Sequence, residues 1–108
     1  AANQKFVEAY RKANAGKRPN YMAVAAYDGM RLIHSALQAT KGATGDALLD
    51  AMKGQSFESP RGPVLIDAQT RDIVQDVYIR RVERRDGELY NVEFDVLKAV
   101  HDPGRRGK

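Results

Sequence analysis

The stretch R-P-N-Y-M-A-V-A-A-Y-D-G-M-R-L-I-H-S-A-L-Q-A-T-K-G, residues 18–42, carries the clearest pattern in the chain and decides its fold. Apolar residues recur every three or four positions: Met22, Ala26, Met30, Ile33 and Leu37. An adjoining stripe of small residues allows close packing: Ala25, Gly29 and Ala36. Polar residues lie on the opposite side: Asp28, Arg31, Gln38 and Lys41. This pattern predicts an amphipathic helix that begins after Pro19-Asn20 and ends before Gly42.

Shorter helices are expected on either side of this segment. The spacing of apolar residues predicts a helix from Asn3 to Ala15, with Asn3 as its N-cap and Gly16 just after its end. A third helix is expected over residues 45–53, capped by Thr44. Helical periodicity then stops.

The second half of the chain has the signals of β-structure. Residues 56–63 have the composition of a turn, and Val64 to Ile66 form a short apolar run that predicts a buried strand. Residues 74–94 predict a β-hairpin with a type I′ turn at Asp86-Gly87. The expected fold is therefore α/β, locally α+β, with three helices, a short strand and a hairpin.

A two-residue turn at this place also predicts the register of the hairpin. Four pairs of facing residues follow: Arg85 with Glu88, Arg81 with Val92, Ile79 with Phe94, and Val77 with Val96. One face should then carry four apolar residues: Tyr90, Val92, Phe94 and Val96. Residues 101–108 are expected to form a frayed tail.

The composition limits the classes of function. The 108 residues, 43% hydrophobic and 30% charged, fit one globular domain. No apolar run approaches the ~18–20 residues that span a bilayer, and the first residues do not have the pattern of a secretory signal. The absence of cysteine excludes disulfides, thiolate catalysis and Cys-ligated metals. Two histidines, His34 and His101, argue against a histidine-based metal site or triad.

Individual polar residues do not combine into a catalytic arrangement. Asp28 is expected to be a solvated helix residue, and His34 lies on the polar side of the same helix. Asp67 and Asp72 flank a short turn and are expected to cap it. Three hydroxyl residues have no positioned base: Ser56, Ser59 and Thr70. The sequence therefore predicts no catalytic residue, no metal site and no cofactor, and a small enzyme is the least favoured class.

A basic cluster provides an alternative function. The net charge of the chain is +4, and four arginines lie near the hairpin turn: Arg80, Arg81, Arg84 and Arg85. The alternative is a complete, small, basic interaction domain that binds nucleic acid through this Arg80–Arg85 hairpin. Alternation along a strand divides the arginines between two faces, and neighbouring acidic residues dilute them, so nucleic acid is not the expected partner.

Six segments, taken in order, resemble a known family. They are F-V-E-A-Y-R-K (6–12), R-P-N-Y-M-A-V-A-A-Y-D-G (18–29), G-D-A-L-L-D-A-M-K-G (45–54), F-E-S-P-R-G-P-V-L-I-D (57–67), Q-D-V-Y-I-R-R-V (75–82) and D-G (86–87). Together they are similar to the C-terminal part of leucine/isoleucine/valine-type periplasmic binding proteins, the solute-binding subunits of ABC importers. Such proteins have two α/β lobes that close over a ligand.

The resemblance implies a single C-terminal fragment that contributes to both lobes. Residues 1–18 would form a second-lobe helix, and residues 19–66 a crossover near the hinge followed by first-lobe helices and a strand. Residues 67–100 would return to a second-lobe hairpin, and residues 101–108 would be the tail. The long helix would pack against a sheet, with Asp28 and Gly29 at helix-packing positions.

The resemblance also implies a ligand site at the start of the long helix. Met22, with Tyr21 and Ala25 as neighbours, falls where a residue of the family reaches the ligand; branched-chain binders often have an aromatic residue in place of Met22. The implied ligand is an amino acid or a small organic acid, the implied partners are the importer's membrane subunits, and the implied location is the periplasm. A fragment of this kind is expected not to bind ligand alone and to self-associate through its exposed apolar face.

Overall fold

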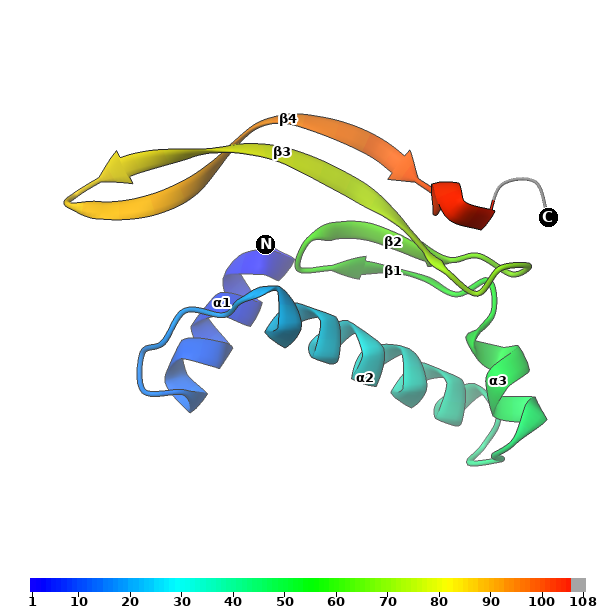
Figure 1. Cartoon of the computed structure of the whole chain (residues 1–108). Coiled ribbons are helices and arrows are strands. Elements are labelled where there is room, and N and C mark those ends of the chain that lie inside the picture. The colour runs from blue at the N-terminus through cyan, green and yellow to red at the C-terminus, as the bar shows by residue number, and fades with distance from the viewer. Residues whose placement is uncertain (106–108) are drawn as a thin grey trace.

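The computed structural model describes residues 1–105, in which three helices precede a four-stranded sheet (Figure 1). The helices are α1 (Ala2–Ala13), α2 (Tyr21–Ala39) and α3 (Asp46–Met52). The strands are β1 (Ser56–Ser59), β2 (Gly62–Ile66), β3 (Ile73–Arg85) and β4 (Glu88–Val100), and a 3₁₀ helix, η1 (Pro103–Arg105), follows. The expected mixed α/β class is confirmed.

Helix α2 forms where the sequence predicts it. Asn20 is its N-cap, and the Asn20 side chain accepts a hydrogen bond from the N–H of Ala23 at 3.0 Å. At the other end the N–H of Gly42 donates to the carbonyl of Leu37 at 2.8 Å, with Gly42 at φ 86°. These two ends fix the direction in which the chain enters and leaves the helix.

The caps of the shorter helices differ from the prediction. Helix α1 begins after Ala1, which has no side-chain oxygen to cap it, and Asn3 lies inside the helix, where its side chain donates to the carbonyl of Pro60 at 2.9 Å. Helix α3 begins after Gly45, and Thr44 does not cap it. A contact distant in sequence has taken the place of a local one at Asn3.

The four strands form an antiparallel sheet in chain order, β1-β2-β3-β4. The prediction of a turn over residues 56–63 is wrong, because Ser56–Ser59 is a strand whose Phe57 pairs with Val64. Only Pro60 and Arg61 connect the two strands. Within β2, Val64 is buried as expected, whereas Leu65 is exposed.

The β3–β4 hairpin turns at Asp86-Gly87, and both residues have positive φ, 51° and 80°. Near the turn the predicted register is confirmed, with Arg85 opposite Glu88 and Arg81 opposite Val92. Further from the turn it is wrong: Ile79 faces Asp95 and Val77 faces Leu97. The cause is a bulge at Phe94, an extra β4 residue that shifts the pairs from Ile79 to Val77 by one, and a second irregularity before Gln75 shifts its pair with Val100 by one more.

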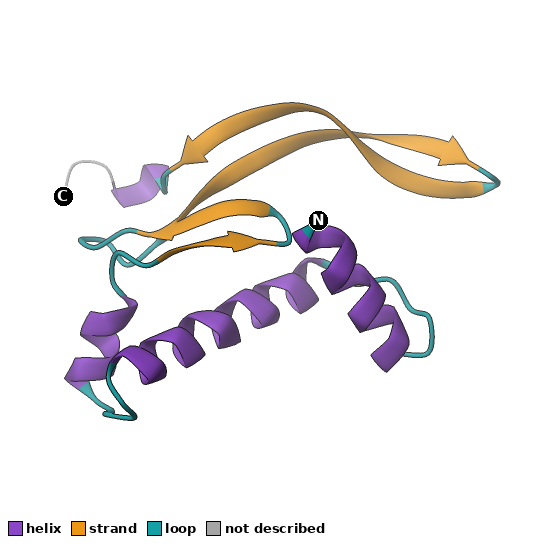
Figure 2. Ribbon diagram, turned by 180° about the vertical axis from the view of Figure 1, so that it is seen from behind, coloured by secondary structure: helices purple, strands orange, loops and turns teal. Residues whose placement is uncertain are grey.

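The molecule is more open than a compact domain of its length. The three helices lie along one side of the sheet, and the hairpin extends beyond the shorter strands (Figure 2). The radius of gyration is 16.4 Å, against about 13 Å for a compact domain of this length. The exposed area is 8101 Å², against about 6,000 Å² for a compact monomer of this mass. Much apolar surface therefore stays uncovered.

The uncovered surface includes the apolar face of α2. Met22, Met30 and Ile33 are exposed, whereas the buried α2 residues are Asp28 and Ala36. The prediction that Asp28 faces solvent is therefore wrong. Gly29 also has no close neighbour, since a Cβ built on it would meet no atom of another element within 4 Å.

The end of the chain is partly ordered by local contacts. Residues Pro103–Arg105 form η1 where a frayed tail was expected. The remainder of the predicted tail, residues 106–108, lies outside the described residues.

Among the described helices, none is long and apolar enough to cross a membrane.

Candidate functional site

The first turns of α2 carry the three residues predicted to bind ligand. Tyr21 is 74% exposed and Met22 61% exposed, and Ala25 is also exposed. Tyr21 and Ala25 are four residues apart and therefore lie on the same side of the helix, whereas Met22 points to the neighbouring side. All three are available at the surface, and none belongs to the core of the described residues.

A buried carboxylate lies further along the same side of α2. Asp28 follows Ala25 by three residues and is 4% exposed. Its Oδ2 accepts a hydrogen bond from the Ser59 hydroxyl at 2.7 Å and one from Nε of Arg61 at 3.0 Å. Its Oδ1 is buried without a hydrogen-bond partner among the described residues. Asp28 therefore fixes the β1–β2 turn onto α2.

The β1–β2 turn is the point where several elements meet. The N–H of Arg61 donates to Oγ of Ser59 at 3.2 Å, and the hydroxyl of Tyr78 donates to the carbonyl of Arg61 at 2.7 Å. Asn3 of α1 reaches the same turn at Pro60. Ser59 was expected to have no positioned base; its hydroxyl does donate to the Asp28 carboxylate, but this serine is 1% exposed and the bond holds the turn in place.

The segment that leads into α2 is held by the hairpin. The Arg18 guanidinium forms an ion pair with Glu88 and donates a hydrogen bond to the Tyr90 hydroxyl at 2.9 Å. Its Cζ lies 4.4 Å from the centre of the Tyr90 ring, and the Tyr90 hydroxyl donates to Glu88 at 3.2 Å. Residues 14–20, the connection between α1 and α2, are thus tied to the tip of the hairpin.

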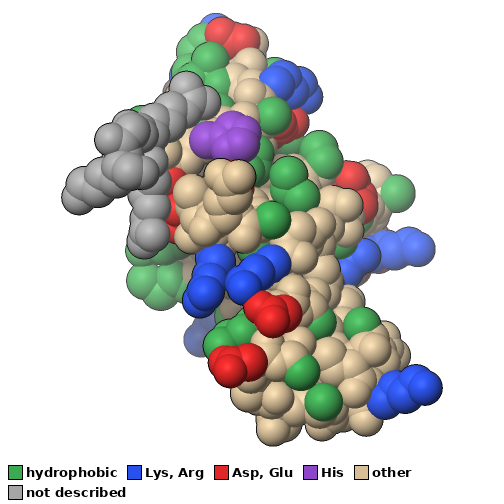
Figure 3. All heavy atoms as spheres, turned by 90° about the vertical axis from the view of Figure 1, so that its right-hand side faces the viewer, with side chains coloured by type: hydrophobic (Ala, Val, Ile, Leu, Met, Phe, Trp, Pro, Cys, Tyr) green, Lys and Arg blue, Asp and Glu red, His purple; other side chains and the backbone are tan. Residues whose placement is uncertain are grey.

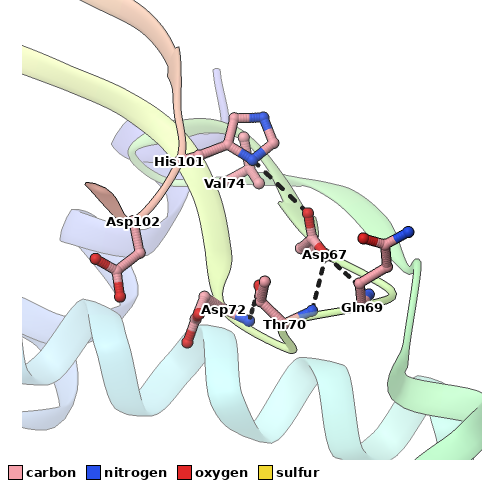
Figure 4. A pocket seen from close by; sticks show the side chains of 7 residues that line it. All are labelled: Asp67, Gln69, Thr70, Asp72, Val74, His101 and Asp102. Atoms are coloured by element: carbon pink, nitrogen blue, oxygen red, sulfur yellow. Dashed lines mark hydrogen bonds and ion pairs between the residues drawn. The ribbon is translucent and has the colours of Figure 1, made fainter. Parts of the chain in front are cut away.

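A recess of about 300 Å³ lies between the β2–β3 connection and the end of β4 (Figure 4). Asp67 Oδ1 accepts hydrogen bonds from the N–H groups of Thr70 and Gln69 at 2.9 and 2.8 Å. These two donors hold the pKa of Asp67 below its usual value. Nδ1 of His101 lies 3.7 Å from Oδ2 of Asp67. The predicted capping role of Asp67 is confirmed, and its oxygens serve the turn.

Acidic and histidine side chains of the described residues do not gather into a metal-binding group. Within residues 1–105, no group of three or more His, Asp or Glu residues is placed to hold a metal ion. His34 is exposed, as expected.

Three of the four hairpin arginines bind oxygens of the hairpin itself, and the Cζ of Arg80 lies 5.6 Å from the centre of the Tyr78 ring. Arg81 and Arg85 both bind Glu83, at 2.6 and 3.0 Å, and these two arginines lower the pKa of the Glu83 carboxyl. Arg84 donates to the carbonyl of Gly87 at 3.0 Å. At the opposite end of the molecule from the hairpin tip, shown in Figure 3, basic, acidic and apolar side chains are interspersed as well. Nothing in the described residues supports nucleic-acid binding.

Sequence reasoning missed the partners of Asp28 and Arg18. The small residues beside Asp28 gave no usable signal, because Ala25 and Gly29 are both exposed in the structure. No local signal marks Arg18, because Glu88 is 70 residues away in the chain.

Comparison with known proteins identifies the class to which this chain belongs. A family model described as periplasmic binding protein matches residues 1–88. The Leu/Ile/Val-binding protein homolog 6 of Brucella abortus (strain 2308) is 40% identical over 98% of the chain. The chain spans about 28% of that relative's length.

Solved structures agree with this assignment. A solute-binding protein of an ABC transporter from Rhodopseudomonas palustris BisB5, in complex with 3,4-dihydroxybenzoic acid, is 57% identical with a TM-score of 0.92. The match covers 96% of this chain and 29% of that one. A similar protein from R. palustris HaA2, in complex with p-hydroxybenzoic acid, is 47% identical with a TM-score of 0.74, over 80% of this chain and 24% of that one. The chain belongs to the periplasmic binding protein family, and the predicted resemblance is confirmed.

Proposed function

We propose that this chain acts as the C-terminal part of the solute-binding component of an ABC importer, and that its ligand is a small aromatic carboxylic acid. The observation that carries the ligand class is the 57% identity, over 96% of the chain, to a protein solved with 3,4-dihydroxybenzoic acid. A 43% identical protein of R. palustris was solved with 4-hydroxybenzoate. The second candidate is a branched-chain amino acid, favoured by the name of the 40% identical Brucella relative.

The ligand contacts proposed within this chain are Tyr21, Met22 and Ala25. Their support is their exposure at the start of α2, next to the crossover that Arg18 holds. The thioether of Met22 and the phenol ring of Tyr21 provide the apolar and aromatic surface that a benzoate ring would contact. The chain spans 29% of the solved relative, so other contacts would come from segments that correspond to the rest of that protein.

The proposed mechanism is closure of two lobes around the ligand. Residues 1–18 and 67–100 would belong to one lobe and residues 19–66 to the other, with the crossover between them. The closed form is favoured because the ligand contacts both lobes, and the importer's membrane subunits would recognise that form. The proposed location is the periplasm, and no covalent bond changes, so no enzyme activity is part of this function.

Titration of the complete translation product that contains these 108 residues tests the proposal. We expect heat of binding with 3,4-dihydroxybenzoate and 4-hydroxybenzoate, and none with leucine. Binding of leucine alone would replace the aromatic ligand by the second candidate. No binding of either class would refute the proposed function.

A matched pair of methionines tests the proposed contact. Met22 and Met30 are 61% and 63% exposed on the same helix, two turns apart. Met22→Ala is expected to weaken aromatic-acid binding by roughly 5- to 50-fold, as expected for loss of a side chain that touches the ligand. Met30→Ala should leave the affinity unchanged. Equal effects of the two variants would remove Met22 from the site.

A further inference from the structure

The tip of the hairpin has an anchor outside the sheet. Beyond Gln75, β3 pairs only with β4, because the register between β2 and β3 ends at the Val64–Gln75 pair. The distal part of the hairpin therefore lacks support from the rest of the sheet. It lies on the same side of the molecule as the α1–α2 crossover (Figure 1). Arg18 joins the two through Glu88 and Tyr90.

The geometry of this joint is specific to arginine. The Arg18 Cζ lies over the Tyr90 ring, 4.4 Å from its centre, while Nη2 reaches both the Glu88 carboxylate and the Tyr90 hydroxyl. The Tyr90 hydroxyl also donates to Glu88, so the three groups form a closed set. A lysine ammonium can form the ion pair but has no plane with which to stack. The set joins Arg18 to Glu88 and Tyr90, which come 70 and 72 positions later in the chain.

Only two residues separate this joint from α2. Pro19 and Asn20 follow Arg18, and Asn20 already caps the helix through Ala23. The ring of Pro19 fixes its own φ, which further limits the freedom of the link. A shift of Arg18 would therefore be passed through a short, stiff connection to Tyr21 and Met22.

We infer that Arg18 is a positioning residue that sets Tyr21 and Met22 for ligand by holding the crossover against the hairpin tip. The inference rests on the proposed function, because that function places the ligand at these two residues. Arg18 itself touches no ligand in this scheme. Its effect on affinity passes through the place and order of the first turn of α2.

The test compares Arg18→Gln with Arg85→Gln in the complete translation product. Both variants remove one exposed hairpin-associated charge, but Arg85 binds Glu83 within its own strand and does not reach the crossover. Arg18→Gln should weaken 4-hydroxybenzoate binding about 3- to 10-fold, the loss expected for an exposed ion pair with stacking. It should also speed amide hydrogen exchange at residues 86–91 by a similar factor in the ligand-free protein. Arg85→Gln should leave the affinity unchanged.

Rescue separates positioning from general stability. Arg18→Glu and Glu88→Arg should each weaken binding when made alone. The double variant restores the ion pair with the charges exchanged and should recover part of the lost affinity. Equal affinities of Arg18→Gln and Arg85→Gln would overturn the inference. Faster exchange at the tip with intact affinity would also overturn it, because the joint would then exist without coupling to the ligand.

The proposed function can fail separately. A wild-type protein that binds no aromatic acid would refute the proposed function through the titration alone. The exchange comparison needs no ligand, and unchanged exchange at residues 86–91 in Arg18→Gln would refute the role of Arg18 in holding the tip.

Discussion

Gly62 tolerates little change at the β1–β2 turn, where the helices contact the sheet. Its φ is 103°, a conformation that side-chain-bearing residues rarely adopt. A Cβ built there would lie 2.5 Å from the Tyr78 hydroxyl. That hydroxyl is not free to move, since it donates to the carbonyl of Arg61 at 2.7 Å.

Gly62→Ala should therefore lower the free energy of unfolding by about 2–4 kcal/mol, from backbone strain and the clash together. Gly16→Ala is the control, because Gly16 has a positive φ of 78° but no atom within 4 Å of an added Cβ. It should cost about 1–2 kcal/mol. Urea unfolding followed by circular dichroism measures both. In a Tyr78→Phe background the cost of Gly62→Ala should shrink; an unchanged cost would contradict the clash.

Asp86-Gly87 and Asp28 show which properties of single residues can be predicted from the sequence. The turn at Asp86-Gly87 was predictable because both residues accept positive φ, and the local backbone alone decides the outcome. The burial of Asp28 was not predictable, because its partners Ser59 and Arg61 are 31 and 33 residues away. The ligand role of Tyr21, Met22 and Ala25 remains a prediction.

At the scale of the element, the base of the hairpin contains an irregularity held by a single carboxylate. Between Val77 and Gln75 the register of β4 moves from Leu97 to Val100, and Ala99 has a positive φ of 47°. Asp76 accepts a hydrogen bond from the N–H of Ala99 at 2.9 Å and one from Nζ of Lys98 at 3.0 Å. The N–H of Ala99 first, and Lys98 second, hold the pKa of Asp76 below its usual value. Asp76 in turn raises the pKa of Lys98.

The sign of the pH dependence follows from these directions. A carboxyl whose pKa is lower in the folded state stabilises the fold above its unfolded pKa of about 3.9. That contribution is lost as the pH falls through the lower, folded value. The raised pKa of Lys98 stabilises the fold below the unfolded value for lysine, about 10.4, and is lost as the pH rises through the folded value.

Asp76→Asn should accordingly destabilise the protein at pH 7, and the difference from wild type should shrink below pH 4 as Asp76 protonates. The measurement is the urea midpoint of both proteins between pH 2 and 7. Asp95→Asn, a change of equal charge on β4, serves as the control. A difference that stays constant across this range would show that the carboxylate charge does not hold the bulge.

Whole elements were predicted correctly where one hydrophobic period runs through the segment, and incorrectly where turn-forming residues interrupt a strand. The apolar period of α2 is long and sets its bounds, so the helix was predictable. Strand β1 was missed because Ser59, Pro60 and Gly62 give its end the composition of a turn. The bulge at Phe94 was missed because period-two alternation carries no mark of an inserted residue.

At the scale of the whole molecule, apolar surface remains uncovered on both the helical side and the hairpin. Met30 and Ile33 are exposed on α2, and Leu89, Phe94 and Leu97 on β4. The excess of exposed area over that of a compact monomer has the same origin. Exposed apolar side chains in such number favour association in water.

We therefore predict that the isolated 108-residue chain self-associates, by stacking of these faces or by exchange of the hairpin between copies. Sedimentation velocity at increasing protein concentration should give a mass that rises above 12.0 kDa. Ile33→Glu should reduce the association, whereas Gln38→Glu, on an exposed polar position of the same helix, should not. A strictly monomeric chain at every concentration would contradict the prediction.

The chain order of the strands has a consequence for the time course of folding. Consecutive strands are neighbours in the sheet, and short connections at residues 60–61, 67–72 and 86–87 join them. Contacts of this kind close early, since little chain entropy opposes them. The Asp28–Ser59 bond and the Arg18–Glu88 pair bridge 31 and 70 residues, and we expect them to form later, because closing a longer loop costs more chain entropy. The sheet can therefore act as the template onto which the helices dock, and the crossover would be the last segment to take its place.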